Sequence, residues 1–165
     1  MQKDCYVIGQ GALTKAEWLT QGGKWVVDSL GDELQVPVVH GDTLTAAVVV
    51  RQVERICRKK GLEPRIFITG ATSKIGRAVI LDLVQKGYQI RMLTSSRERF
   101  EQIRQEAGSF SMNIRLATFF AEGEDCPIWI TGKAVPGGKS FLRHIPEKGV
   151  VINFSEPNPV IKVQE

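Results

Sequence analysis

Residues 70–76, GATSKIG, carry the residue types of a phosphate-binding loop. In such loops, glycines permit a tight turn and a close approach of the backbone to a pyrophosphate, which rests on the N-terminus of the following helix. Gly70 and Gly76 have the spacing of the first and last glycines of the pattern G-x-x-G-x-x-G, and Ser73 replaces the middle one. The Ser73 hydroxyl can donate to a phosphate, and Lys74 adds a positive charge. The segment therefore predicts a dinucleotide-binding loop.

The segments that flank this loop support the prediction. The apolar run RIFIT precedes it and the helical pattern IGRAVILDLVQKG follows it, which is the strand–turn–helix context of a dinucleotide site. The alternative is a structural turn that has kept the fold and lost the ligand. The predicted loop contacts are Gly70, Ala71, Thr72, Ser73, Lys74, Ile75 and Gly76.

The end of the next strand indicates which nicotinamide cofactor fits. An acidic residue there binds the ribose 2′-hydroxyl of NADH, whereas small polar residues with an arginine suit the 2′-phosphate of NADPH. This segment reads TSSR and has no carboxylate before Glu98. We therefore expect NADPH as the cofactor, with contacts from Thr94, Ser95 and Arg97. Ser95 and Glu98 also form a capping-box pattern, and the two roles are compatible.

A further cofactor contact is expected after a later strand. Ligands of open α/β sheets bind outside the carboxyl ends of the strands. Gly132 follows the apolar run PIWIT and should therefore face the nicotinamide side of the site. The nearby sequence AVPGGK is equally compatible with a plain Pro-Gly-Gly turn.

Residues suited to catalysis are few. A Tyr-x-x-x-Lys pair of the short-chain dehydrogenase type is excluded, because the tyrosines are Tyr6 and Tyr88. Cys57 lies on a helical segment and Cys126 precedes an apolar strand, which favours packing over a nucleophilic role for both thiols.

His40 is the best-placed titratable group, if the first half of the chain folds over the cofactor cleft. The alternative is a turn histidine. The adjacent Asp42 and Thr43 are candidate substrate contacts, and one of them is otherwise expected as the N-cap of the next helix. Two histidines and scattered cysteines do not supply a cluster of metal ligands, so we expect no metal centre.

The elements that must position these residues alternate along the second half of the chain. Helical patterns lie at IGRAVILDLVQKG, RERFEQIRQEAG and, more briefly, around GKSFLRHIP. Segments rich in Ile, Val and Phe between them read as strands: RIFIT, YQIRMLT, NIRLATFF, PIWITG and GVVINFS. The alternation predicts an α/β fold, with a Rossmann-like, doubly wound, mostly parallel sheet in three layers and right-handed crossovers.

The first half predicts a strand–helix–strand–helix extension of that core. CYVIGQG and QVPVVHG read as strands, the second at a sheet edge because it contains Pro37. Between them, Thr14 and Glu17 form a capping box that opens a helix, which the glycines at 22–23 interrupt. The last helix, DTLTAAVVVRQVERICRKK, is apolar nearly all round in its first half, which predicts burial between layers.

We accordingly divide the chain into an N-terminal α/β segment (1–61), a nucleotide-binding core (62–157) and a tail (158–165), packed as one compact domain. The length and the 42% hydrophobic content suffice for such a core, and no apolar run approaches the ~20 residues of a membrane helix. The N-terminus lacks the features of a signal peptide and the three cysteines are scattered, so we expect reduced thiols and a cytoplasmic location.

The net charge of +4 has two interpretations. Basic residues concentrate at RICRKKG, RMLTSSRERF and GGKSFLRH, which suits nucleic acid or an anionic membrane surface. Cations in a last helical turn before Gly61 equally suit the helix dipole and a glycine cap. Nucleic acid is not expected as a partner, because no aromatic residues are interleaved with the basic ones.

Two protein families share these motifs in this order. The segments HGDTLTAAVVVRQVERICRKKG, GATSKIGRAV and LTSSRERFEQIRQE resemble the cyanobacterial aldehyde-forming acyl-ACP reductases. Nearly end to end, the chain is similar to the C-terminal domain of the very-long-chain aldehyde decarbonylases of plant cuticular-wax synthesis. That similarity rests on IGQGALTKAEWLTQGGKWVV, VPVVHGDTLTAAVVV, the Ser-Lys pair of the loop, CPIWITGK and EKGVVINFSEPNP.

These resemblances imply an NADPH-binding, reductase-like domain of fatty acyl and aldehyde metabolism. The implied ligand is a fatty acyl thioester or fatty aldehyde, and the implied partner is a membrane-bound domain or protein that would hold the chain at the cytosolic face of a membrane.

Lys148 and Gly149 stand where the acyl-ACP reductases carry an acyl-accepting cysteine. The histidine-box membrane domain of the plant proteins is not part of this sequence, so we expect oxygen-dependent aldehyde cleavage to reside elsewhere. The alternative is a non-catalytic Rossmann-like interaction module of a lipid-synthesis complex.

Overall fold

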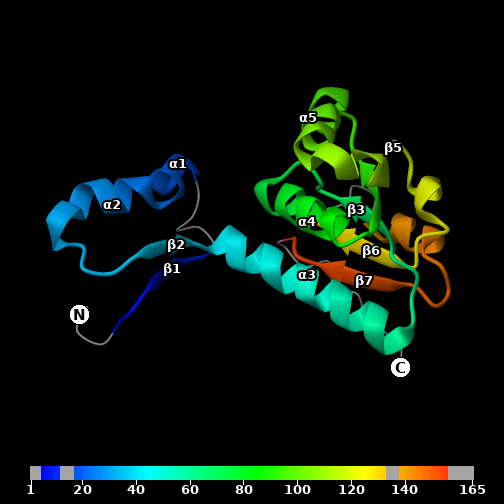
Figure 1. The fold of residues 1–165 in the computed structure, drawn as a ribbon, viewed down its shortest axis with the longest axis horizontal. Helices are drawn as coiled ribbons and strands as arrows, with labels where there is room; N and C mark the ends of the chain where they lie inside the picture. Colours follow the sequence, from blue (N-terminus) through cyan, green and yellow to red (C-terminus); the bar gives the residue numbers. More distant parts are fainter. Residues whose placement is uncertain (1–4, 12–16, 133–137, 156–165) are drawn as a thin grey trace. The chain divides into compact units, whose positions relative to one another are not determined.

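The computed structural model describes residues 5–11, 17–132 and 138–155 (Figure 1). The chain divides into two compact units, residues 1–45 and 46–165. Helix α3 (Gly41–Lys60) contains the boundary between them. The segments in which Thr14 and the predicted tail lie are outside the described residues.

The N-terminal unit contains two short parallel strands, β1 (Ile8–Gln10) and β2 (Val38–His40). The helical segments between them are α1 (Glu17–Thr20), η2 (Gln21–Gly23), α2 (Lys24–Leu30) and η3 (Gly31–Glu33). Gly22 and Gly23 have φ angles of 67° and 97°, conformations that glycine adopts readily, and they separate α1 from α2. The predicted interruption and the strand–helix–strand–helix order are both confirmed.

The second unit contains a five-stranded sheet in the order β5-β4-β3-β6-β7, and every pair of neighbouring strands is parallel. The strands are β3 (Arg65–Thr69), β4 (Gln89–Leu93), β5 (Ile114–Ala117), β6 (Ile128–Thr131) and β7 (Val150–Asn153). The chain proceeds outward from β3 in one direction and then returns to add β6 and β7 on the other side. This is the predicted doubly wound fold, with its switch point between β3 and β6.

Helices cover the first face of this sheet. Ile66 and Ile68 of β3 point into a core shared with α4 (Lys74–Gln85), α5 (Arg97–Ala107) and the part of α3 after Thr45. The second face carries Phe67 and Trp129, whose ring centroids lie 4.2 Å apart. Three short 3-10 segments complete the unit: η4 (Gly108–Asn113), η5 (Phe120–Gly123) and η6 (Gly138–His144), and residues of η5 and η6 pack on the second face. The helix predicted around GKSFLRHIP is thus the 3-10 segment η6.

Two helix starts and one burial pattern differ from the prediction. Helix α3 begins at Gly41, so Asp42 and Thr43 lie inside its first turn and neither is the N-cap. The N-cap of α5 is Ser96 rather than Ser95, because the Ser96 hydroxyl accepts the N–H of Arg99 at 3.3 Å. The first half of α3 is not buried all round, since Leu44 and Val48 are 69% and 45% exposed.

The aromatic cluster on the second face leaves no space beside Gly123. An added methyl there would lie 2.6 Å from Cδ2 of Phe67 and 2.6 Å from Cζ2 of Trp129. We expect Gly123→Ala to lower the free energy of unfolding by about 1–3 kcal/mol, because the rings must shift. Urea unfolding followed by tryptophan fluorescence measures this loss. The control is Gly9→Ala, where an added methyl meets no atom within 4 Å. If Gly123→Ala unfolded at the same urea concentration as the wild type, the tight packing around Gly123 would be contradicted.

Cys126 lies in the same cluster and is 1% exposed. Burial raises the pKa of its thiol to about 11, so the thiol stays protonated at neutral pH. We expect iodoacetamide at pH 8 to alkylate the exposed Cys5 first and to reach Cys126 only in urea. Peptide mapping by mass spectrometry follows each thiol, and rapid alkylation of Cys126 in the folded chain would show a reactive rather than a packing cysteine.

Candidate nucleotide-binding site

The loop after β3 is shaped by its first and last glycines. Gly70 has φ 66°, and a Cβ at this position would lie 2.4 Å from the carbonyl carbon of Gly132. A Cβ at Gly76 would lie 2.4 Å from the carbonyl oxygen of Gly70. The loop therefore contacts both the loop after β6 and its own helix, backbone to backbone. Glycines at the two ends of a dinucleotide-binding loop serve this same geometry.

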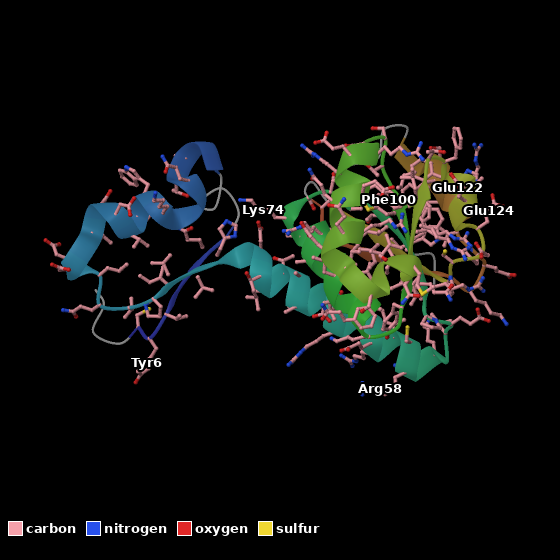
Figure 2. The ribbon with its side chains drawn as sticks, turned by 45° about the horizontal axis from the view of Figure 1, so that its top comes forward. Tyr6, Arg58, Lys74, Phe100, Glu122 and Glu124 are labelled. Atoms are coloured by element: carbon pink, nitrogen blue, oxygen red, sulfur yellow. The ribbon has the colours of Figure 1, made fainter. Side chains whose placement is uncertain are left out.

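Ser73, in the place of the middle glycine, is the N-cap of α4. Its hydroxyl oxygen accepts the N–H of Gly76 at 3.0 Å, and its own N–H donates to the Gly70 carbonyl at 3.1 Å. The hydroxyl hydrogen of Ser73 is not used in this contact, so it can donate to an anion at the helix N-terminus. Lys74 is the first residue of α4 and is exposed (Figure 2).

The end of β4 lies next to this loop in the sheet, since β3 and β4 pair in parallel. Thr94 accepts the N–H of Ser96 through its hydroxyl oxygen at 3.1 Å, and its own N–H donates to Ala117 at 3.2 Å. Arg97 is the first residue of α5, and Ser95 and Arg97 are exposed. The predicted residues after β4 are therefore on the surface at the carboxyl edge, as a contact to a ribose phosphate requires.

A small cavity lies between the glycine loop and α5. Its volume is about 120 Å³, and Thr72, Arg77 and Arg99 contribute to its wall, together with Gln102, Ile103 and Glu106. Arg77 forms an ion pair with Glu106, whereas Arg99 is an exposed cation in the first turn of α5. The cavity is far smaller than the 300 Å³ or more typical of a whole-ligand pocket, so it suits a group the size of a phosphate. Sequence reasoning missed Arg99, although it lies in the basic stretch that contains Arg97.

Gly132 lies at the switch point, where its N–H donates to the Thr69 carbonyl at 3.1 Å. Beside it, the Thr131 hydroxyl donates to the Asn153 side-chain oxygen at 2.7 Å. The ring of Phe154 covers Gly132, because a Cβ on this glycine would lie 2.1 Å from Cζ of Phe154. Sequence reasoning missed Phe154, and no pattern around it signals this position. The carboxyl edge therefore brings together the glycine loop, the end of β4 and Gly132.

The other predicted site residues lie in the N-terminal unit. His40 Nδ1 accepts the N–H of Asp42 at 3.3 Å, and it lies 3.5 Å from the Asp42 carboxylate. Nε2 of His40 is buried and has no hydrogen-bond partner among the described residues. Thr43 is exposed. The catalytic role of His40 and the substrate contacts of Asp42 and Thr43 stay predictions.

The described residues contain neither a metal cluster nor a helix that could span a membrane. Within residues 5–11, 17–132 and 138–155, His, Cys, Asp and Glu form no group of three that could hold a metal ion. None of the helices in these ranges has both the length and the apolar character that crossing a membrane requires.

Solved structures with a similar fold include a dipicolinate synthase polypeptide from Bacillus halodurans, with a TM-score of 0.55 and 11% identity. The match covers 81% of this chain and 48% of that one. A protein from Mesorhizobium loti described as an NADPH:quinone reductase gives a TM-score of 0.53 and 16% identity, over 82% of this chain and 38% of its own. At these identities the likeness shows the fold, which is the predicted Rossmann-like one.

Proteins related by sequence have a higher identity to this chain than these solved structures do. The very-long-chain aldehyde decarbonylases GL1-2 and GL1-1 of rice, Oryza sativa subsp. indica, are 40% and 38% identical to this chain over 128 residues. The match covers 77% of this chain, and this chain spans only about a fifth of the length of either relative. The family described as "CER1-like, C-terminal domain" matches residues 66–164, which include the glycine loop, the end of β4 and Gly132. The chain therefore belongs to the CER1-like C-terminal domain family.

Proposed function

We propose that this chain is an NADPH-binding, reductase-like domain of fatty acyl and aldehyde metabolism. The observation that carries the proposal is the glycine loop at the switch point. Its two end glycines pack backbone to backbone, and they present the N-terminus of α4 between β3 and β6. In open α/β sheets this is the position at which dinucleotides bind.

The N-terminus of α4 supplies the interactions that a pyrophosphate needs. A twelve-residue helix directs its unpaired N–H groups and the positive end of its dipole toward the loop. The Gly76 N–H donates to the Ser73 hydroxyl oxygen and is therefore not available to a phosphate. The Ser73 hydroxyl hydrogen can donate to the phosphate in its place. The Lys74 ammonium, one residue further on, adds a positive charge. Binding of the diphosphate through Ser73 and Lys74 is thus compatible with the missing middle glycine.

The preference for NADPH rests on the arginines after β4. Arg97 begins α5 at the carboxyl edge, and Arg99 borders the cavity of phosphate size beside Thr72. A guanidinium group can form paired, charge-assisted hydrogen bonds with a phosphate. Because no carboxylate precedes Glu98 in this segment, the acidic residue that typically binds the ribose 2′-hydroxyl of NADH is missing there.

The substrate class follows from the relatives, whose names refer to very-long-chain aldehydes. We infer a fatty acyl thioester or a fatty aldehyde as the ligand, and a membrane-bound partner domain or protein. Bound NADPH would supply a hydride to the acyl carbonyl carbon; with one proton, a thioester then yields an aldehyde and a free thiol. His40 is the candidate proton donor.

A non-catalytic interaction module is the second candidate, and one contact favours it. The Phe154 ring occupies the space directly against Gly132, on the side of the site where the nicotinamide would lie. In a catalytic domain this ring has to form one wall of the nicotinamide pocket or move aside. In a module that has lost the cofactor it would simply close the switch point.

Titration of the purified chain with NADPH and NADH tests cofactor binding. We expect tighter binding of NADPH, and we expect Arg97→Ala to weaken NADPH about 5- to 100-fold while leaving NADH unchanged, because a charge-assisted hydrogen bond is lost. Isothermal titration calorimetry gives both affinities. The matched control is Arg104→Ala, which removes an arginine that pairs with Glu101 in the same helix. Absence of saturable binding of either cofactor would leave only the interaction module, and an unchanged preference in Arg97→Ala would refute the assignment of the 2′-phosphate.

Incubation with a long-chain acyl-CoA or acyl-ACP and NADPH tests the chemistry separately. We expect NADPH oxidation together with a fatty aldehyde, which gas chromatography detects as its oxime. A variant with a blocked glycine loop, Gly76→Val, should form no aldehyde, because its side chain would meet the Gly70 carbonyl. Circular dichroism checks that this variant is folded. If NADPH binds to the wild-type chain and no aldehyde appears with either thioester, the reductase role in this chain is wrong.

A further inference from the structure

We propose that the outer face of α3 docks this domain on an anionic lipid membrane surface. This inference does not depend on cofactor binding. It concerns the cationic face, which we define as Arg51, Arg55, Arg58 and Lys59, and all four side chains lie at least partly open to solvent. Figure 2 shows Arg58 on the side of α3 that points away from the sheet.

The cationic face lies directly opposite the buried face of the same helix. Ala46, Val49, Val50 and Val53 pack into the core. At about 100° of rotation per residue, the four cations fall within an arc of about 100° on the other side. No acidic residue lies in this arc, since Glu54 is on its flank and pairs with Lys86 at 2.9 Å. The cationic face is therefore a continuous positive strip, anchored rigidly on the sheet by the valines behind it.

The fold itself does not account for these charges. Arg58 and Lys59 lie in the last turn before Gly61, where cations stabilise the C-terminus of a helix. Arg55 and Arg51 lie about one and two turns earlier, beyond the reach of that effect. Neither of them forms an ion pair with another residue in the described ranges. Their positive charge is thus available to a ligand outside the chain.

Apolar groups accompany the cations, as they do in helices that lie in a membrane interface. Val48, 45% exposed, lies in the same arc one turn before Arg51 and Gln52. A shallow hollow alongside the cationic face is lined by Gln52, Arg55, Ile56, Lys59 and Lys60, of which Ile56 is the apolar residue. Basic residues on one helical face, with apolar side chains between them, are typical of binding to anionic lipid headgroups.

The composition of the cationic face favours lipid over nucleic acid as its partner. No aromatic side chain lies among its residues, so it has no platform on which bases could stack. Guanidinium groups form paired hydrogen bonds with the phosphates of lipid headgroups, and each basic residue near an anionic surface contributes about 1 kcal/mol. Four such residues along about 12 Å of helix match a flat, negatively charged surface.

Flotation of the full chain with lipid vesicles tests the proposal. We expect binding to phosphatidylcholine vesicles that contain about one-third phosphatidylserine, no binding to pure phosphatidylcholine vesicles, and release at high salt. The double variant Arg51→Glu/Arg55→Glu should bind the vesicles at least about 30-fold more weakly. It removes two positive charges and adds two negative charges, which the anionic surface repels. Circular dichroism and cofactor titration of this variant should match the wild type.

The matched control is Arg115→Glu/Lys148→Glu, which makes the same change in net charge at exposed residues of β5 and of the turn before β7. It should retain vesicle binding. Equal loss in both variants would show that only net charge matters, and retention in the α3 variant would refute the cationic face. Equal binding to neutral and anionic vesicles, or binding to a single-stranded oligonucleotide without binding to vesicles, would also overturn the proposal.

Discussion

The contact between the backbones of Gly70 and Gly132 is the constraint on which the rest of the second unit depends. It joins the ends of β3 and β6, the two strands between which the chain reverses its direction of winding. A side chain at Gly70 would collide with the backbone of Gly132, and a side chain at Gly132 would collide with the ring of Phe154. Because β3, β6 and β7 are parallel, the α4 N-terminus and the Thr131–Asn153 hydrogen bond lie at the same edge of the sheet as this contact.

The two faces of the sheet are built differently, and this asymmetry places the functional surfaces. Aliphatic residues and regular helices form the first face, whereas aromatic rings and short 3-10 segments form the second. The Phe67 ring is tilted against the Trp129 ring, with Phe120 and Phe141 around them, so a compact aromatic layer compensates for the absence of a long helix among the described residues there. Long helices, with their N-termini and charged outer faces, are consequently found on the first face.

Sequence patterns predicted the sheet well, because each strand is a short β-branched or aromatic run between polar turns. The close backbone contacts of Gly70 and Gly76 agree with the predicted glycine turn, since only glycine accepts those contacts, whereas their role in cofactor binding stays a prediction. The cap of α5 was assigned one residue too early, because Ser95 and Ser96 have the same chemistry and only the helix geometry selects between them. Burial of α3 was overestimated for a similar reason: an apolar residue such as Leu44 does not reveal whether anything covers it. Arg99 lies in a basic stretch that the sequence shows, but the cavity that it borders forms only where α5 packs beside α4 and the glycine loop. Phe154 could not be found in the sequence, because its contact with Gly132 exists only once β7 lies beside β6.

Ser73 has a consequence for the loop before any ligand arrives. A serine N-cap stabilises a helix by about 1 kcal/mol, and a serine has fewer conformations in the unfolded chain than a glycine. The loop therefore keeps its shape without a ligand, and its ordering entropy is lost during folding rather than during binding. Ser73 limits the close approach of the backbone to the phosphates and so weakens that contact. This loss in binding free energy is offset, because a dinucleotide that binds does not have to order the loop.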